Sequence, residues 1–374
     1  MIVRFRAPVS VFLNVTYRCN LSCVYCSADA GPARRDELDP AELRRIVDEL
    51  IACGVRRVIV TGGEPFVRSD LFDVLTALRQ ARVVVHINTN GTLLRESTCE
   101  RLRDLRIAKI AISLDGVGDV NDITRGRGSA ARTARGIRAL VAVGVRPTLL
   151  LTLTRHNVEA LEPAVAECRR LGAAAVSINP LSPVGRGTGC YDGLRLTPDE
   201  WESAAHTIRR LQAEYPRFVQ ADFLHWSTKP QALERAAAAT REGRPPRARY
   251  LLPCDAAKAF CAITPDGSVL PCNKFDTYRC GSLREESLLA IWQGDAMERI
   301  RRLGGCAVAQ TSVCASCRYH VVCSGGCRAE AYRAFGRLDA PDPACALLPD
   351  AAVHALTPAD TCGEPCGVCS KTFA

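Results

Sequence analysis

Residues 11–26, VFLNVTYRCNLSCVYC, join a short apolar run to three cysteines in a C-x3-C-x2-C spacing. The run is rich in Val, Phe and Leu, as buried strands are, and a polar loop follows it. A buried strand that leads straight into a loop of reactive side chains is typical of a parallel sheet, whose functional groups follow the carboxyl ends of its strands. We therefore expect Cys19, Cys23 and Cys26 to lie in a functional site.

The chain repeats this alternation of apolar runs and helical stretches as far as Tyr215. The apolar runs cover residues 11–17, 58–61, 83–88, 110–114, 149–153 and 176–179. The helical stretches cover residues 41–52, 71–79, 96–105, 130–143, 158–171 and 199–215, and several end near Gly54, Gly144 or Gly172. Six such units predict an α/β fold, a partial (β/α)6 TIM-type barrel.

The composition excludes several classes of protein. The chain has 374 residues, of which 47% are hydrophobic and 24% charged, which fits a globular protein of two domains and not a disordered or fibrous one. No apolar run approaches the roughly 18 residues of a membrane span, and no signal peptide precedes the first strand, so we expect a cytoplasmic protein without a membrane partner. The net charge is +9, but no basic run is interleaved with aromatic residues, so we expect no nucleic-acid partner.

The cysteine content and a change of pattern divide the chain. Twenty cysteines are too many for a typical cytosolic enzyme and favour thiolate ligands to metal. The alternation stops near Asp222, and residues 241–249, REGRPPRAR, read as a linker. We therefore expect a barrel over residues 1–221, a bridging linker over 222–253, a small cysteine-rich domain over 254–346 and a cysteine-containing tail over 347–374.

The N-terminal cysteine triplet has the donor set of an iron–sulfur cluster with one open position. Three thiolates ligate three irons of a four-iron cube and leave the fourth iron free to bind a small molecule. A zinc site or a set of buried thiols is the alternative, although a closed zinc site normally needs a fourth ligand, and no other His or Cys lies close by in the sequence.

The triplet, together with aromatic Tyr25 and the turn Gly62-Gly63-Glu64-Pro65, resembles the radical S-adenosylmethionine (radical SAM) superfamily across the whole barrel. The resemblance implies that Cys19, Cys23 and Cys26 hold a [4Fe-4S] cluster that binds SAM and cleaves it to a deoxyadenosyl radical, which takes a hydrogen atom from the substrate. It also implies that residues at the strand ends bind SAM: Tyr25, Gly62, Gly63, Glu64, Pro65, Asn88, Ser113, Asp115, Arg125 and Asn179. For Asn88, its neighbour Asn90, Asp115 and Arg125, strand-end capping or turn formation is the alternative.

The C-terminal cysteines supply eight thiolates, enough for two closed sites. Their spacing, and the stretch from Gly281 to Trp292 between them, resemble the SPASM extension of radical SAM enzymes. By that resemblance Cys254, Cys261, Cys272 and Cys327 hold one auxiliary cluster, and Cys314, Cys317, Cys323 and Cys345 hold a second. Two zinc ribbons are the alternative, and Cys254 is ambiguous because its spacing to Cys261 varies among relatives.

The expected cofactors are therefore SAM and three [4Fe-4S] clusters, one SAM-binding and two auxiliary. Their charges would lower the net charge of the chain to about +4. The auxiliary clusters would transfer electrons or staple the small domain, and a flavodoxin- or ferredoxin-type protein is the expected electron donor. Cys53, Cys99 and Cys168 are expected to be small core residues, while Cys280, Cys306 and the tail cysteines Cys362, Cys366 and Cys369 have no assigned role.

Cys190 is a candidate catalytic residue because it lies in a Gly-rich stretch, residues 183–193, just after the sixth apolar run. A thiol at the barrel mouth could return a hydrogen atom to a substrate radical. The stretch resembles the cysteine loop of radical SAM enzymes that epimerise or oxidise aminocyclitol and aminoglycoside intermediates. An ordinary loop cysteine is the alternative.

These observations favour a radical SAM/SPASM enzyme, an epimerase or dehydrogenase that acts on an aminocyclitol-containing sugar. Only about ten residues precede the first strand, so we expect no fused leader-binding domain of the kind that binds peptide substrates. A maturase that crosslinks or epimerises a ribosomally made peptide is the alternative, with a peptide as its substrate. A non-catalytic electron carrier or zinc-stapled scaffold is a third hypothesis, which the intact triplet and Gly62–Pro65 argue against.

Overall fold

The computed structural model describes residues 5–32, 36–221, 238, 241–242, 254–303, 313–317, 319–323, 325–343 and 345. The chain divides into two compact units, Met1–Leu224 with Ala256–Glu298, and His225–Asp255 with Arg299–Ala374. Most of the expected linker, the whole tail, and the cysteines Cys306, Cys362, Cys366 and Cys369 lie outside the described residues.

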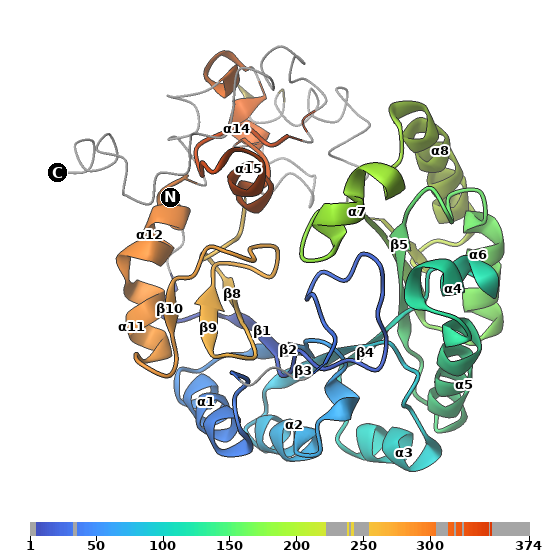
Figure 1. Ribbon diagram of the computed structural model, residues 1–374, viewed down its shortest axis with the longest axis horizontal. Helices are drawn as coiled ribbons and strands as arrows, with labels where there is room; N and C mark the ends of the chain where they lie inside the picture. Colours follow the sequence, from blue (N-terminus) through green and yellow to red (C-terminus); the bar gives the residue numbers. More distant parts are fainter. Residues whose placement is uncertain are drawn as a thin grey trace. The chain divides into compact units, whose positions relative to one another are not determined.

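The first unit is built on one curved sheet of ten strands (Figure 1). Its six central strands are parallel and occur in chain order: β1 (Ser10–Asn14), β2 (Arg57–Thr61), β3 (Val84–Thr89), β4 (Lys109–Ser113), β5 (Thr148–Leu153) and β6 (Ala175–Pro180). A two-residue strand, β7 (Val219–Gln220), extends the sheet beyond β6. The predicted α/β partial barrel with six βα units is confirmed.

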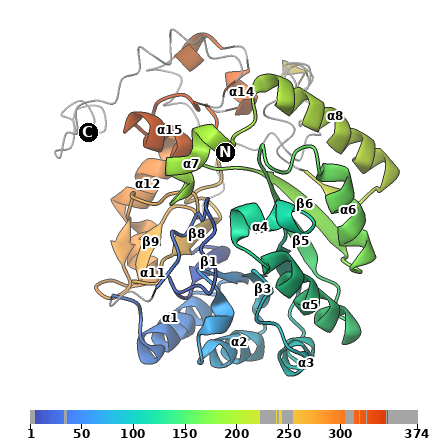
Figure 2. The same cartoon turned by 45° about the vertical axis from the view of Figure 1, so that its right-hand side comes forward.

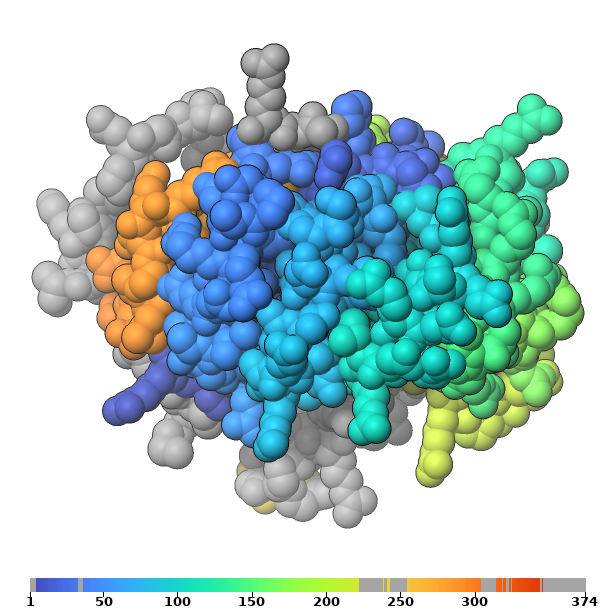
Figure 3. Space-filling model, turned by 90° about the horizontal axis from the view of Figure 1, so that it is seen from below, coloured from blue at the N-terminus to red at the C-terminus, as the bar shows by residue number. Residues whose placement is uncertain are grey.

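Six helices cover the outer side of the sheet, as Figures 1 and 2 show: α1 (Pro40–Ala52), α2 (Leu71–Gln80), α3 (Glu96–Asp104), α5 (Ser129–Ala142), α6 (Leu161–Arg170) and α8 (Pro198–Glu214). Seen from below, the blue to teal part of the chain, which includes α1, α2 and α3, forms a continuous surface (Figure 3). Three further elements were not predicted: the 3-10 turn η1 (Pro65–Val67) and the short helices α4 (Asp119–Arg125) and α7 (Gly187–Leu194). All three lie in loops that follow a strand.

Local sequence signals set the ends of the long helices. Helices α1 and α8 each begin with a capping box and a proline at the first helical position, with Asp39 and Thr197 as the N-caps. Gly54, Gly144 and Gly172 follow α1, α5 and α6 with φ between +73° and +83°, a left-handed conformation that favours glycine. The boundaries predicted from the sequence therefore agree with the structure to within a few residues.

The core lies between the sheet and the helices. Strand residues such as Leu13, Val58 and Ile87 are fully buried, and they alternate with less buried residues along β1 and β3. Cys99 and Cys168 are buried, as expected for small core residues. Cys53 is only half-buried because it forms the C-cap of α1, which corrects its assignment to the core.

The cysteine-rich segment begins as part of the barrel sheet. Strand β8 (Phe260–Ile263) pairs in parallel with β1, and β9 (Ser268–Leu270) and β10 (Gly281–Ser282) continue the sheet in antiparallel fashion. Helices α11 (Leu288–Gln293) and α12 (Asp295–Arg302) follow. No local sequence pattern predicts this pairing, because it joins strands about 250 residues apart in the sequence.

In the second unit the described elements are η3 (Val313–Ser316), α14 (His320–Cys323) and α15 (Arg328–Phe335). Across the described part of the chain, no helix is both long and apolar enough to span a membrane.

Candidate active site

The three cysteines after β1 lie on one closed loop, residues 18–31, which we call the cluster loop. Its two ends meet in a short bridge between Arg18 and Gly31, where the Cys19 N–H donates to the Gly31 carbonyl at 2.9 Å. The Gly31 N–H in turn donates to the Tyr17 carbonyl at 3.0 Å. We call this bridge between Arg18 and Gly31 the neck of the cluster loop. It closes the short stretch of chain that carries Cys19, Cys23 and Cys26, all of which are half-buried.

The surroundings of the three sulfurs fit thiolate ligands of a metal cluster. Backbone N–H groups of Leu21 and Ala30 donate to the sulfurs of Cys19 and Cys26, each at 3.4 Å, and such donors favour thiolates. The pKa of Cys19 is raised to about 11, chiefly by burial, and the charges of Glu64, Cys23 and Cys26 contribute to the rise. Buried, mutually repelling thiolates need a compensating cation, which an iron–sulfur core would supply. Among the described residues, no three His, Cys, Asp or Glu side chains converge as ligands of a single metal ion.

The glycine pair after β2 packs against the neck of the cluster loop. A Cβ on Gly62 would lie 2.6 Å from the Thr16 carbonyl oxygen, and one on Gly63 would collide with the Arg18 carbonyl. The Gly63 N–H donates to the Thr16 carbonyl at 2.6 Å, and the Glu64 N–H donates to the Arg18 carbonyl at 2.8 Å. The two glycines therefore allow the chain after β2 to lie close to the backbone that leads into the cluster loop. Contact of these glycines with SAM stays a prediction.

Glu64 is fully buried and joins the ends of β2 and β3. One carboxylate oxygen accepts from the Thr89 hydroxyl at 2.7 Å and the other from the Asn90 N–H at 2.7 Å. The pKa of Glu64 is raised to about 7, because burial raises it by more than these hydrogen bonds lower it. The Asn90 side chain lies beside the cluster loop, because its amide donates to the Asn20 side chain at 2.9 Å and faces the Cys19 sulfur at 3.8 Å.

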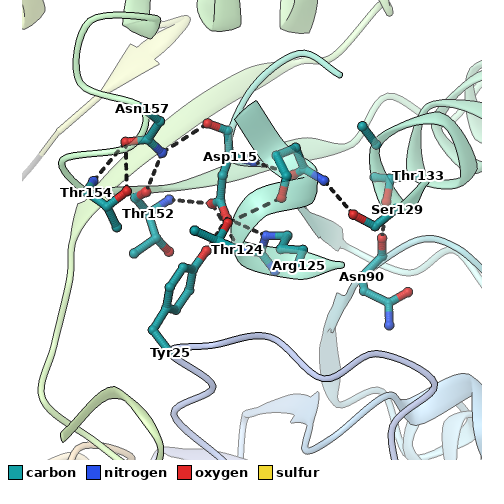
Figure 4. Close-up of polar contacts among 12 residues, drawn as sticks. Tyr25, Asn90, Asp115, Thr124, Arg125, Ser129, Thr133, Thr152, Thr154 and Asn157 are labelled. Carbon is teal, nitrogen blue, oxygen red and sulfur yellow. Dashed lines mark hydrogen bonds and ion pairs between the residues drawn. The ribbon is translucent and has the colours of Figure 1, made fainter. Parts of the chain in front are cut away.

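Three predicted residues, Tyr25, Asp115 and Arg125, meet in one buried network (Figure 4). The Arg125 guanidinium forms a two-pronged ion pair with the Asp115 carboxylate at 2.6 and 3.1 Å. The Tyr25 hydroxyl donates to the same carboxylate from the cluster loop. Because Asp115 follows β4 and Arg125 ends α4, the network joins the cluster loop to the fourth βα unit.

Both oxygens of the Asp115 carboxylate accept hydrogen bonds from other residues of the protein. Besides Tyr25 and Arg125, it accepts from the Thr124 hydroxyl at 3.2 Å and from the Thr152 N–H at 2.9 Å. The Arg125 charge also acts on Cys23: burial raises the pKa of that thiol, and the guanidinium opposes the rise. Within this network Arg125 alone favours negative charge at Cys23, against burial and the Asp115 carboxylate, while the Tyr25 contact fixes the segment of the cluster loop around Tyr25.

The other predicted SAM-binding residues stand at three strand ends. Asn88 and Ser113 are half-buried near the ends of β3 and β4, and Asn179 is exposed near the end of β6, where its amide donates to the Ser177 carbonyl at 3.1 Å. Pro65 is buried at the start of η1. The structure thus places all of them at the carboxyl edge of the sheet, and their roles stay predictions.

Cys190 lies on α7, which corrects the expected loop: the Gly-rich stretch becomes helical from Gly187. Its thiol is half-buried and lies 3.5 Å from the Val24 carbonyl oxygen of the cluster loop. It packs against a small buried cluster formed by Tyr25, Leu181 and Leu194. The sequence placed this cysteine after the correct strand but did not predict its contact with the cluster loop.

The first auxiliary ligand set is divided between the two units. Cys261 is fully buried in β8 and Cys272 is buried after β9, both in the first unit, while Cys254 and Cys327 belong to the second unit. The Cys272 sulfur accepts from the Lys274 N–H at 3.4 Å. Cys280, which has no assigned role, is half-buried between β9 and β10.

The second auxiliary set lies wholly in the second unit. The pKa of Cys323 is raised to about 12, chiefly by burial, and neighbouring Cys345, Asp342 and Cys314 contribute to the rise, so these side chains are near one another. The Cys317 N–H donates to the Cys314 carbonyl at 3.1 Å. Asp342 accepts from the N–H groups of Cys327 at 2.7 Å and Cys345 at 3.0 Å, through its side chain and its carbonyl respectively.

Comparison with known proteins agrees with this geometry. Residues 13–168 match the model of the radical SAM superfamily, and residues 254–318 match that of SPASM, an iron–sulfur cluster-binding domain. The chain belongs to the radical SAM superfamily and carries a SPASM domain.

Three curated relatives cover nearly the whole chain. The chain is 32% identical to mycofactocin maturase MftC of Mycolicibacterium smegmatis over 91% of its length and 83% of that protein. It is 28% identical to the AdoMet-dependent heme synthase of Methanosarcina barkeri, over 93% of this chain and 99% of that one. It is 29% identical to the PqqA peptide cyclase of Granulibacter bethesdensis, over 91% and 88%. One of these names is that of a peptide cyclase and another that of a heme synthase, and none of the three is that of an aminocyclitol enzyme.

A solved structure shares the fold. Streptococcus suis SuiB bound to the precursor peptide SuiA matches 92% of this chain and 77% of that one, with a TM-score of 0.74 and 19% sequence identity.

Proposed function

We propose that this chain is a radical SAM enzyme that modifies a ribosomally made peptide, forming a crosslink or an epimerised residue. The observation that carries the proposal is the 32% identity to a mycofactocin maturase over 91% of the chain. The PqqA peptide cyclase and the peptide-bound SuiB structure point to the same class of substrate. An enzyme that acts on an aminocyclitol or on a tetrapyrrole is an outcome that the experiment below distinguishes.

In this proposal Cys19, Cys23 and Cys26 hold the SAM-binding cluster. When SAM and the cluster are bound, they supply a deoxyadenosyl radical that abstracts a hydrogen atom from an unactivated carbon. The chain's own contribution is to fix the three thiols: the neck at Arg18 and Gly31 closes the loop, and Gly63 and Glu64 hold it against β2. Ser113, Asn88 and Asn179 are the proposed SAM contacts at the strand ends.

The Tyr25, Asp115 and Arg125 network serves mainly to position the cluster loop. Asp115 is 1% exposed and its two oxygens already accept from protein donors on four residues. A carboxylate in that state has little capacity left for a ligand. Arg125 places its charge near Cys23, where it stabilises negative charge on the sulfur and on a cluster bound there.

We propose two auxiliary clusters, with the ligand sets given above, in a domain over residues 254–346. The grouping of Cys314, Cys323 and Cys345 supports the second set. A crosslink removes two electrons from the peptide, so an auxiliary cluster would accept the second of them, and a flavodoxin- or ferredoxin-type protein would supply the electron that cleaves SAM. Cys190 would return a hydrogen atom if the product is an epimer.

The test is an anaerobic reaction of cluster-reconstituted protein with SAM and reductant in deuterated water. Substrates are offered separately: short peptides encoded beside the gene, a panel of aminocyclitol sugars, and a tetrapyrrole precursor of heme. Deoxyadenosine and substrate mass are followed together. We expect deoxyadenosine with a peptide that loses two hydrogens or gains one deuterium. Conversion of a sugar or the tetrapyrrole, with every peptide unchanged, would reject the peptide proposal.

The matched control replaces Cys19, Cys23 and Cys26 together with alanine. This variant keeps the proposed auxiliary ligands and loses the proposed SAM-binding set. It should produce no deoxyadenosine and retain about eight iron atoms per chain. Equal deoxyadenosine from the variant and the wild type would mean that the cleavage site has been placed wrongly.

A further inference from the structure

Arg186 reaches from the loop after β6 onto the cluster loop. Its Nε and Nη2 donate to the Cys23 carbonyl, each at 3.1 Å, and its Nη1 donates to the Ala30 carbonyl at 2.6 Å and to the Asp29 carboxylate at 3.0 Å. Its own N–H donates to the Cys26 carbonyl at 3.0 Å. One residue therefore binds the cluster loop at its second and third cysteines and, beyond them, at Asp29 and Ala30.

The two glycines beside Arg186 make this approach possible. Gly185 has a φ of +58°, and a Cβ there would lie 2.6 Å from the Cys26 carbonyl oxygen and 2.7 Å from that of Ser27. A Cβ on Gly187 would lie 2.7 Å from the Ser182 carbonyl oxygen. A side chain at Gly185 would push this loop away from the cluster loop, and one at Gly187 would collide with Ser182 of the same loop, so glycine at both positions allows Arg186 to approach the cluster loop.

Arg186 also adds charge at the cysteines. Its Nε and Nη2 lie 3.1 Å from the Cys23 carbonyl oxygen, so its positive charge lies beside the chain that carries the predicted ligands, although Nη1 also pairs with Asp29 at 3.0 Å. Arg186 is about one third exposed, so solvent screens part of this effect. A planar guanidinium can donate to several carbonyls at once while keeping its charge. A lysine ammonium would keep the charge but lack the planar arrangement of several N–H donors.

We propose that Arg186 is a positioning residue that ties the cluster loop to the end of β6 and favours the reduced state of the SAM-binding cluster. The inference rests on the proposed placement of that cluster at Cys19, Cys23 and Cys26. Reduction adds a negative charge to the cluster, and a nearby cation stabilises that charge. The same side chain restrains the backbone that carries two of the ligands, so its loss also loosens their hold on the cluster.

The experiment compares the wild type with Arg186→Gln and Arg186→Lys, all as anaerobic, cluster-loaded full-length protein. Two properties are measured without substrate: the midpoint potential of the SAM-binding cluster by EPR-monitored titration, and the rate of iron loss to a chelator. The matched control is Arg195→Gln. Arg195 is exposed, directly follows α7 and pairs with Asp192 in that helix, whereas Arg186 directly precedes α7.

For Arg186→Gln we expect a more negative midpoint potential and about tenfold faster loss of the SAM-binding cluster, because a loss of about 1.4 kcal/mol from charge-assisted hydrogen bonds changes a rate by that factor. For Arg186→Lys we expect a midpoint potential near that of the wild type, since lysine keeps the positive charge. We expect a rate of cluster loss close to that of Arg186→Gln, since lysine cannot form the several hydrogen bonds of the guanidinium. Arg195→Gln should change neither property.

Unchanged potential and unchanged loss rate in Arg186→Gln would overturn the inference. The auxiliary clusters serve as the folding control, because they remain visible in a correctly folded variant and disappear in a misfolded one. Should Arg186→Gln misfold, the loss rate of Arg186→Lys decides, and a wild-type rate there overturns the positioning role. A wild-type protein that binds no cluster at Cys19, Cys23 and Cys26 would instead reject the proposed function.

Discussion

At the residue scale, the buried network around Asp115 gives the sharpest expectation for stability. Asp115→Ala leaves the Arg125 guanidinium buried, at 9% side-chain exposure, without its carboxylate. Breaking a buried pair by removing one partner typically costs about 3–5 kcal/mol, and we expect the free energy of unfolding to fall by that amount. Urea unfolding followed by circular dichroism measures it.

The control for this change is Asp192→Ala, which breaks the exposed ion pair with Arg195. Exposed pairs contribute about 0–1 kcal/mol, so the two aspartate variants should differ by several-fold in their cost. A cost for Asp115→Ala no larger than that of Asp192→Ala would contradict a structural role for the network.

Glu64 makes the stability of the barrel depend on pH. Its folded pKa of about 7 lies above the usual value of 4.5, because burial disfavours the charged form. The folded state therefore binds the proton more tightly, and the stabilisation that this supplies is present at low pH and is lost as the pH rises through about 7. Relative to Glu64→Gln, whose amide does not titrate, the wild type should lose up to about 3 kcal/mol between pH 5 and pH 8. Equal pH profiles for the two proteins would contradict this.

At the scale of elements, the cluster loop depends on the glycine pair after β2. Gly63→Ala would drive a methyl group into the carbonyl of Arg18 at the loop's neck, and backbone cannot move aside as a side chain can. We expect this variant to lose about four iron atoms per chain and the ability to form deoxyadenosine, while the auxiliary clusters remain. Iron analysis and EPR test this, with Gly189→Ala as the control, since a Cβ there meets no atom within 4 Å. Wild-type iron content in Gly63→Ala would show that the neck tolerates displacement.

The sequence predicted the elements whose signals are local. Apolar periodicity, capping boxes and the glycines at 54, 144 and 172 defined the six βα units to within a few residues. Helices α4 and α7 were missed because they are short, and because α7 contains three glycines, which are poor helix formers. In the site, the spacing of the cysteines identified the candidate ligands, but the contacts of Tyr25 and Arg186 join segments 90 and about 160 residues apart, which no local pattern encodes.

At the scale of the whole molecule, the cysteine-rich segment is not independent of the barrel. Strand β8, which carries Cys261, extends the barrel sheet through its pairing with β1. The sequence suggested a segment held together by metal, because its apolar runs are short. Yet Ala262, Ile263, Val269 and Leu270 are all buried, so the first part of the segment shares the barrel's apolar core. A fold held together by metal stays a prediction for the second unit.

In that unit, Arg328 is completely buried, and among the described residues it donates only to carbonyl groups: to Leu338 at 2.8 Å, Ala340 at 2.7 Å, Gly326 at 3.4 Å and Gly325. It thereby connects the turn after α15 to the glycines between Cys323 and Cys327.

Arg328→Met would leave these buried carbonyl groups without donors, which costs about 1–3 kcal/mol of stability for each group that stays buried. We expect the variant to lose the iron held by the second unit, with the signal of the SAM-binding cluster and the urea transition of the barrel retained. Arg337→Met, which breaks an exposed ion pair with Asp339 two residues away, is the control and should keep all its iron. Full iron content in Arg328→Met would show that the ligand loops hold their clusters without this arginine, and simultaneous loss of the barrel transition would show that the two units unfold together.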